Sequence, residues 1–324
     1  MSAGIRRIFA AMTRHLRSLL DLTPAETHRV VDLAAEVKAS PGAYTKALEG
    51  KSVAMIFSKQ STRTRISFEV GLHQLGAQPL VLSTSGGTGM QMGRGETVAD
   101  TAKVLSRFVH GIVIRTFGQD EVDGLAEHGS VPVVNALTDL YHPCQALADL
   151  LTIREQLGST KGKKLVYVGA GNNVAHSLLL CGPRSGMDVV VACPESLRPN
   201  ATVLDRARAD AAAAGTRCAV ITDVHEAVKD ADVIYTDTWV SMGEEEEAKS
   251  LIKILSGYTV TEELMAATGK AGTIFMHCLP AHRGEEVSAE VMDGPRSVVF
   301  DEAENRLHAQ KALMLLLLEG ASWT

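Results

Sequence analysis

The sequence lacks the features that mark membrane proteins, nucleic-acid binders and disulfide-stabilised folds. Its best apolar run, 312–318, is far too short to span a bilayer. The net charge of −6 argues against nucleic acid as a partner, although it does not exclude a local basic pocket. The five cysteines are odd in number and form no CxxC pair, which indicates free thiols in a reducing compartment and gives no sign of zinc. What remains is an ordinary globular composition, 45% apolar and 22% charged, in a chain of 324 residues that is long enough for two domains.

The first residues are unusual because they lack acids. The stretch 4–18 holds four arginines, and no Asp or Glu precedes Asp21. That composition is typical of an organelle transit segment or its remnant, so a chloroplast or mitochondrial location is predicted. The alternative is a basic first element of a bacterial cytoplasmic enzyme, and the sequence leaves both open.

Short apolar runs alternate with helical patterns along most of the chain, and this alternation predicts an α/β fold with parallel sheets. The segment Gly158–Gly162 divides the alternation into two series. We therefore predict two doubly wound parallel-sheet domains with the active site in the cleft between them. The predicted domains are 14–150 and 160–300, with a C-terminal helix over 305–320 packing back on the first. Strands are predicted near 53–57, 79–82, 111–115, 131–134, 164–168, 188–192, 217–221, 232–236 and 273–276, and helices in the first half near 24–38, 63–75, 96–108, 119–127 and 143–157.

The segment Ser61–Arg65 lies between a predicted strand and a predicted helix. Backbone N–H groups at a helix start are free, and the positive end of the helix dipole lies there, so the position suits an anion. Three hydroxyls and two guanidinium groups add donors that match phosphate oxygens. The simpler alternative is a capped helix with surface arginines.

Polar residues also follow several other predicted strands. Because parallel strands present their carboxyl ends at one edge, where α/β proteins bind ligands, this recurrence predicts one site between the two domains. The residues concerned are Arg115, Asn135, His142, the segment 169–173, the segment 237–243, and His277 with Cys278.

The segment 169–174 invites a dinucleotide-binding interpretation, because Gly169 and Gly171 follow a strand. Val174 replaces the third glycine, and no acid ends the following strand, so an NAD-dependent oxidoreductase is disfavoured. Asn172 and Asn173 together offer donors and acceptors that suit an amino-acid headgroup.

Two further groups can do chemistry at this edge. His142 is either a core histidine or a donor that, beside Gln145 and Arg115, polarises a carbonyl oxygen. Cys278 is either a small buried side chain or a thiolate favoured by nearby arginines, facing an amine rather than acting as a nucleophile. Asp237, with the loop that follows it, suits an α-amino acid, and an exposed loop is an equal alternative.

Five motifs together resemble the ornithine carbamoyltransferases of the aspartate/ornithine carbamoyltransferase superfamily. They are Ser61–Arg65, His142–Gln145, Asp237–Gly243, His277–Pro280 and Glu304–Arg306. The first indicates carbamoyltransferases in general, whereas the Ser-Met-Gly loop and His-Cys-Leu-Pro are the parts specific for ornithine. The resemblance runs from about residue 14 to 318. A departure is Ala170, where the family often has Asp.

The resemblance implies transfer of a carbamoyl group from carbamoyl phosphate to L-ornithine, without metal or organic cofactor, by a homotrimer with sites shared between subunits. It implies Arg115, His142 and Cys278 as catalytic residues and Asn173, Asp237, Ser241 and Met242 as ornithine ligands. It implies as carbamoyl-phosphate ligands Ser61, Thr62, Arg63, Thr64, Gln91, Arg115, His142, Gln145, Cys278, Leu279 and Arg306, with Gln91 reaching in from a neighbouring subunit.

Overall fold

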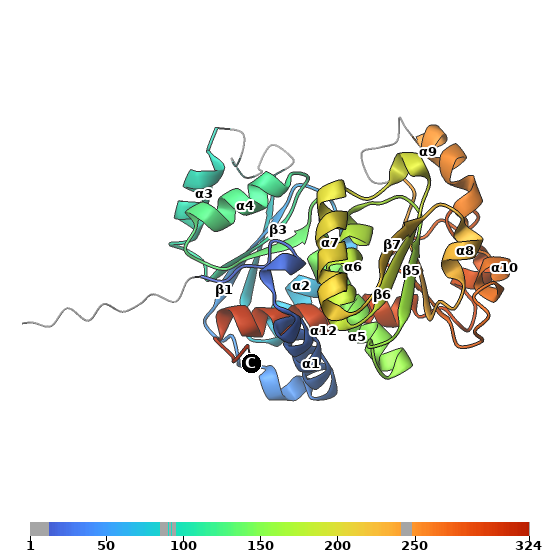
Figure 1. Ribbon diagram of the computed structural model, residues 1–324. Coiled ribbons are helices and arrows are strands. Elements are labelled where there is room, and N and C mark those ends of the chain that lie inside the picture. The colour runs from blue at the N-terminus through green and yellow to red at the C-terminus, as the bar shows by residue number, and fades with distance from the viewer. Residues whose placement is uncertain (1–12, 85–89, 91, 93–94, 241–247, 324) are drawn as a thin grey trace, which may run out of the picture.

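The computed structural model describes residues 13–84, 90, 92, 95–240 and 248–323. The described strands form two parallel sheets in separate halves of the molecule (Figure 1), which confirms the predicted α/β class. The first sheet has the order β2-β1-β3-β4 and the second the order β7-β6-β5-β8-β9. The strands are β1 (Ser52–Phe57), β2 (Gln78–Ser83), β3 (Gly111–Arg115), β4 (Val133–Leu137), β5 (Lys164–Val168), β6 (Asp188–Ala192), β7 (Cys218–Ile221), β8 (Val233–Thr236) and β9 (Ile274–His277).

The helices cover these sheets and connect their strands. The α-helices are α1 (Pro24–Ala39), α2 (Thr62–Gln74), α3 (Val98–Leu105), α4 (Gln119–His128), α5 (Pro143–Leu157), α6 (Asn173–Cys181), α7 (Ala201–Ala214), α8 (Val224–Val228), α9 (Ala248–Leu255), α10 (Glu262–Ala266), α11 (Ala289–Met292) and α12 (Val299–Leu318). Short 3-10 helices lie at Leu19–Asp21, Pro41–Tyr44, Pro183–Ser185, Glu195–Leu197 and Ser256–Tyr258. None of the helices in these ranges is both long and apolar enough to cross a membrane.

The inner strands of each sheet are buried on both faces, and alternate side chains of a strand point to opposite faces. In β1, Val53 and Met55 enter one hydrophobic cluster, whereas Ala54 and Ile56 enter another with residues of α3 and α4. In β5, Leu165 belongs to the first of these clusters. That cluster therefore runs without a break from the first sheet into the second, which fixes the two sheets against a shared core.

The helix α12 is the main link between the halves. It begins beside β9 of the second sheet and packs along α1, α5 and α2 (Figure 1). Its apolar residues Ala312–Leu316 are fully or almost fully buried. A polar side chain on α12 can thus be held where both halves meet.

Two predicted boundaries differ from the structure. The strand predicted at 131–134 is β4, which starts at Val133, after Pro132, whose missing N–H cannot join a ladder. The helix predicted at 96–108 is the shorter α3, because the side chain of Thr97 accepts a hydrogen bond from the backbone N–H of Asp100 and so caps its start.

Candidate active site

The turn after β1 is built as the sequence predicts. Ser61 caps α2, and its hydroxyl accepts a hydrogen bond from the backbone N–H of Thr64 at 3.2 Å. Thr62, Arg63 and Thr64 form the first helical turn, so their backbone donors and the positive end of the helix dipole lie at the carboxyl edge of the sheet.

Three arginines converge on this turn. Arg115 Nη1 and Arg306 Nη2 both lie 3.4 Å from the hydroxyl oxygen of Thr64. Arg63 lies near enough to oppose the charge of Arg115. Burial lowers the pKa of Arg115 to about 10, with the charges of Arg306 and Arg63 adding to the effect.

No carboxylate in the described part of the chain forms an ion pair with Arg63, Arg115 or Arg306. The Nε atoms of Arg115 and Arg306 are buried and have no hydrogen-bond partner among the described residues. Burying cations without a counter-charge is unfavourable, so this arrangement requires an anion. Forked guanidinium donors match the oxygens of a phosphate.

His142 lies beside the arginines as the N-cap of α5. Its backbone N–H donates to the hydroxyl of Ser177 at 2.8 Å, and its ring is buried. Burial, together with the charges of Arg306 and Arg115, lowers the pKa of His142 well below its usual value. The ring is therefore neutral at pH 7, and its Nδ1 has no partner among the described residues. A neutral imidazole in this place can donate or accept one hydrogen bond to a bound ligand.

The loop after β9 reaches the arginines through its backbone. Leu279 has a φ of +60°, which is rare for a residue with a side chain and is found mostly at functional sites. Its carbonyl oxygen accepts a hydrogen bond from Arg63 Nη2 at 2.7 Å. The buried ring of His277 holds this conformation, because its Nδ1 accepts from the backbone N–H of Leu279 at 2.9 Å and its Nε2 contacts Glu286 at 3.2 Å.

Asp237 directly follows β8, which ends at Thr236. Its carboxylate accepts hydrogen bonds from Asn172 Nδ2 at 2.8 Å and from the Cys278 thiol at 2.9 Å. The thiolate hypothesis for Cys278 is wrong in this structure. Burial, and then the adjacent charge of Asp237, raise the pKa of Cys278 well above its usual value, so the side chain is a thiol that donates to Asp237.

Asn172 and Asn173, at the start of α6, make different contacts, although the sequence predicted a single role for both in binding an amino-acid headgroup. Asn172 caps the helix and also binds Asp237. Asn173 donates to the carbonyl oxygen of Thr138 at 2.6 Å, which ties α6 to the loop before α5. The Asn173 side chain is half-buried and does not itself bind Asp237.

Most of the predicted residues thus meet in one place. Arg115 and Arg306 both contact the hydroxyl of Thr64, Gln145 accepts from Arg306 Nη1 at 2.6 Å, and Arg63 donates to the carbonyl oxygen of Leu279. The predicted residues Gln91, Ser241 and Met242 lie outside the described residues.

Sequence reasoning missed Asn172 as the partner of Asp237, and it missed Asp149 and Glu302, which bind the Gln145 amide nitrogen. A signal for the last two was present. Asp149 lies four residues after Gln145, and Glu302 four before Arg306, so each pair shares one helix face.

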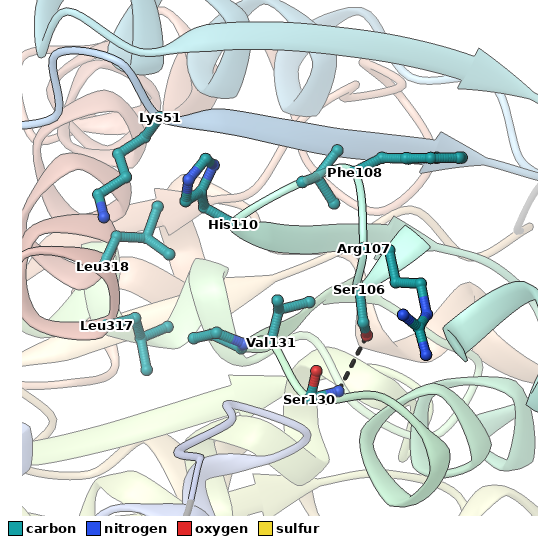
Figure 2. A pocket seen from close by; sticks show the side chains of 11 residues that line it. Lys51, Ser106, Arg107, Phe108, His110, Ser130, Val131, Leu317 and Leu318 are labelled. Atoms are coloured by element: carbon teal, nitrogen blue, oxygen red, sulfur yellow. Dashed lines mark hydrogen bonds between the residues drawn. The ribbon is translucent and has the colours of Figure 1, made fainter. Parts of the chain in front are cut away.

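A separate hollow of about 470 Å³ lies at the opposite edge of the first sheet (Figure 2). Lys51, Arg107 and His110 line it, next to the hydrogen bond from the Ser130 backbone N–H to the Ser106 hydroxyl at 2.9 Å. These residues precede the strands rather than follow them. Because ligands of open α/β sheets bind at the carboxyl ends, this hollow is not the candidate active site.

The sequence matches two family descriptions that together cover most of the chain. Residues 14–155 match the carbamoyl-P binding domain of aspartate/ornithine carbamoyltransferase, and residues 161–317 match its Asp/Orn binding domain. An ornithine carbamoyltransferase of Acidothermus cellulolyticus is 51% identical over 96% of this chain and 98% of its own length. One of Thermococcus kodakarensis is 52% identical over 95% and 97%, respectively.

A solved structure of similar shape is the ornithine carbamoyltransferase from Pyrococcus furiosus. It has a TM-score of 0.90 and 50% identity, and the match covers 95% of this chain and 98% of that one. These identities extend over nearly the whole length of each protein, so the chain belongs to the aspartate/ornithine carbamoyltransferase family.

Proposed function

We propose that this chain is an ornithine carbamoyltransferase, which converts carbamoyl phosphate and L-ornithine to L-citrulline and phosphate. The observation that carries the proposal is that the site has two halves of opposite charge. The buried Arg306 and the half-buried Arg63 and Arg115 form no ion pair with a carboxylate of the described residues, and the carboxylate of Asp237 lies near enough to interact with the charges of Arg63 and Arg115. An anionic donor and a cationic acceptor fit these two halves.

Carbamoyl phosphate binds in the arginine half. Its phosphate is held by the first turn of α2 through Ser61, Thr62, Arg63 and Thr64. Its carbamoyl end lies against Arg115, His142, Gln145 and Arg306, and the backbone carbonyls of Cys278 and Leu279 accept from its amide nitrogen. The carbonyl oxygen of Leu279 already accepts a hydrogen bond from Arg63, so the groups that bind the two ends of the ligand are next to each other. In this proposal Gln91 reaches in from a neighbouring subunit.

Ornithine binds in the other half, to Asp237, Asn173, Ser241 and Met242. The attacking group is its δ-amine, which as a free amine has a pKa of about 10.4 and is mostly protonated at neutral pH. The nearby arginines favour loss of that proton, so the site selects the neutral amine.

The neutral amine attacks the carbamoyl carbon, and the carbon–oxygen double bond opens to an oxyanion. Arg115 stabilises this charge, and the neutral His142 ring donates a hydrogen bond to it, as donors of an oxyanion hole do. The carbon–oxygen bond to phosphate then breaks, the oxyanion reforms the carbonyl, and the nitrogen gives up its proton to an oxygen of the departing phosphate. Phosphate leaves with the bonding electrons into the pocket of Arg63.

A single assay tests the proposal. Purified protein is given carbamoyl phosphate with ornithine, putrescine or aspartate, and the carbamoylated products are measured. We expect citrulline from ornithine and little product from the other two. Ligand binding without citrulline would indicate a non-catalytic amino-acid sensor, and carbamoyl-aspartate as the main product would assign the chain to the other branch of the family.

We further propose that the chain divides into a carbamoyl-phosphate domain, 14–150 with the helix 305–320, and an ornithine domain, 160–300.

We also propose a homotrimer with shared sites. If Gln91 completes a neighbour's site, mixing inactive Gln91→Ala and Arg63→Leu subunits restores some activity, since mixed trimers contain interfaces with both wild-type halves. No recovery after proven subunit exchange would place each site within one chain.

We propose two alternative compartments for the protein, an organelle and the bacterial cytoplasm. The Arg-rich stretch 4–18 supports import into a chloroplast or mitochondrion. The bacterial and archaeal relatives named above support the alternative, a bacterial cytoplasmic enzyme. A fluorescent fusion that carries the complete natural N-terminus separates them, because diffuse cytosolic signal excludes import.

A further inference from the structure

Two facing helices carry four polar side chains into the core behind the site. Gln145 and Asp149 lie four residues apart on α5, and Glu302 and Arg306 lie four apart on α12, so each pair projects from one helix face. The two helices pack against each other. None of the four side chains is more than 3% exposed.

The hydrogen bonds among these side chains fix the amide of Gln145 in one orientation. Its Nε2 donates to Asp149 Oδ1 at 2.8 Å and to Glu302 Oε1 at 2.9 Å. Its Oε1 accepts from Arg306 Nη1 at 2.6 Å. A flipped amide would set its oxygen against two carboxyl groups and its N–H groups against a guanidinium group. The carboxyl pair therefore decides that the carbonyl end of Gln145 faces the arginines.

Asp149 and Glu302 differ in how many hydrogen-bond partners their carboxyl oxygens have. Glu302 also accepts from the Tyr235 hydroxyl at 3.0 Å and from the backbone N–H of His277 at 2.9 Å. Asp149 Oδ2 has no partner among the described residues, although it is fully buried. An unpartnered buried carboxyl oxygen beside a second carboxyl group is a favourable place for a proton.

The charges around the pair leave it partly protonated at neutral pH. Burial raises the pKa of Asp149 to about 7, and burial with the charge of Asp149 raises the pKa of Glu302 well above its usual value. The titratable and charged groups that face the pair are Arg306 on α12, Tyr235 on β8, Cys278 after β9 and Cys181 on α6. Only Arg306 is a cation, so it is the group that favours the ionised form.

We propose that Asp149 and Glu302 form a positioning pair that couples anion binding to proton uptake. The pair orients the Gln145 Oε1 toward the arginines. It also takes a proton from solvent when a dianion binds the arginines and returns that proton when the dianion leaves. An O–H bond forms on a carboxyl oxygen as one in solvent breaks, and no bond between heavier atoms changes. The physical cause is that a bound dianion offsets the charge of Arg306, which then stabilises the carboxylate less. The proposed function supplies the identity of the dianion, namely carbamoyl phosphate before reaction and phosphate after it.

Titration calorimetry with sulfate tests this without turnover. Sulfate stays a dianion near neutral pH, so every proton counted belongs to the protein. Measuring the heat in two buffers of different ionisation enthalpy gives the number of protons taken up. We expect an uptake of about half a proton near pH 7, and less well below or well above it, where the pair is already protonated or stays ionised.

Asp149→Asn should bind sulfate with the proton uptake near pH 7 lost, because the remaining Glu302 has no carboxylate beside it and keeps its donors, the Tyr235 hydroxyl and the His277 N–H. The matched control is Asp301→Asn, which removes an exposed carboxylate one residue from Glu302 on the same helix and should keep the uptake. If Asp149→Asn does not fold, Glu302→Gln replaces it. That change removes the repulsion between the carboxyl groups, so the uptake maximum should move to lower pH.

The outcomes separate this inference from the proposed function. Sulfate binding without proton uptake in the wild type overturns the positioning pair alone. Uptake near pH 7 that persists unchanged in both Asp149→Asn and Glu302→Gln assigns the proton to another group, such as His142, and overturns it as well. Failure of both sulfate and carbamoyl phosphate to bind the wild type overturns the anion site, and the proposed function with it.

Discussion

The two halves of the site are prepared in opposite ways. In the arginine half, three cations are gathered and none of them forms an ion pair with a carboxylate of the described residues, and two of their Nε atoms lack a partner there. In the other half, both oxygens of Asp237 already accept hydrogen bonds, from Asn172 and Cys278. The first half is incomplete without an anion, whereas the second is satisfied without a ligand.

This difference bears on how each substrate is recognised. An anion entering the arginine half gains contacts that no protein group supplies, so it binds mainly through charge. The charged α-amino group of an ornithine that enters the other half meets a carboxylate whose donors are already in place, and the gain comes from that charge and from alignment. We therefore expect substitutions in the second half to affect turnover most, and those in the first to affect affinity.

The largest effect should come from Asp237→Asn. An amide keeps the size of the side chain but removes the charge that holds ornithine in line, and alignment alone supplies about 7–11 kcal/mol of barrier reduction in favourable cases. Citrulline formation should be lost while carbamoyl phosphate binds as before. The control is Asp205→Asn on α7, whose exposed carboxylate lies 3.7 Å from Arg208. Equal turnover by wild type and Asp237→Asn would contradict the assignment.

The next effect should come from Arg63→Leu, which removes a forked phosphate donor. Loss of a charged hydrogen bond to a buried ligand costs about 2–4 kcal/mol, so carbamoyl-phosphate affinity should fall sharply in calorimetry. Arg65→Leu is the matched control, because Arg65 lies two residues further along α2, is exposed, and pairs with Glu69 at 3.3 Å. If both variants bind alike, the arginine half does not hold the phosphate.

Local patterns predicted the part of the arginine half that a single segment supplies, namely the turn from β1 into α2. The strand, the Ser61 cap and the arginines after it are consecutive, so the period of the strand and the chemistry of a helix start were enough. The contacts of Asp237 were not predictable in the same way, because Asn172 and Cys278 reach it from other strands. The same limit explains the error about Cys278. The arginines predicted at the same sheet edge suggested a thiolate, but the pKa of a thiol depends on burial and on which charge is adjacent, and the adjacent charge is a carboxylate.

A smaller effect is expected from Asn172→Ala, which tests whether Asp237 is held in place by its neighbour. The Asn172 oxygen caps α6 by accepting from Val174 and Ala175, and loss of such a cap costs about 1 kcal/mol of unfolding free energy. The variant also leaves Asp237 with one donor fewer, so the KM for ornithine should rise. Asn200→Ala is the control, since Asn200 caps α7 in the same way without touching Asp237. A rise in KM for both variants would show that capping alone, and not the contact with Asp237, matters.

The smallest effect should come from Cys278→Ser, and its pH dependence is the informative part. A hydroxyl can donate to Asp237 as the thiol does, so activity should stay within about tenfold and stability within about 1 kcal/mol. Because the folded-state pKa of the thiol is raised, its contribution to stability is full below the unfolded value of about 8.5 and is lost as the pH rises above it. Serine does not titrate in this range. The stability of wild type relative to Cys278→Ser, measured by urea unfolding at about pH 7.5 and about pH 9.5, should therefore fall by up to about 1.4 kcal/mol per pH unit. A relative stability that rises over this range would mean that the folded protein favours the thiolate, and the hydrogen bond from Cys278 to Asp237 would then be the wrong description of this half of the site.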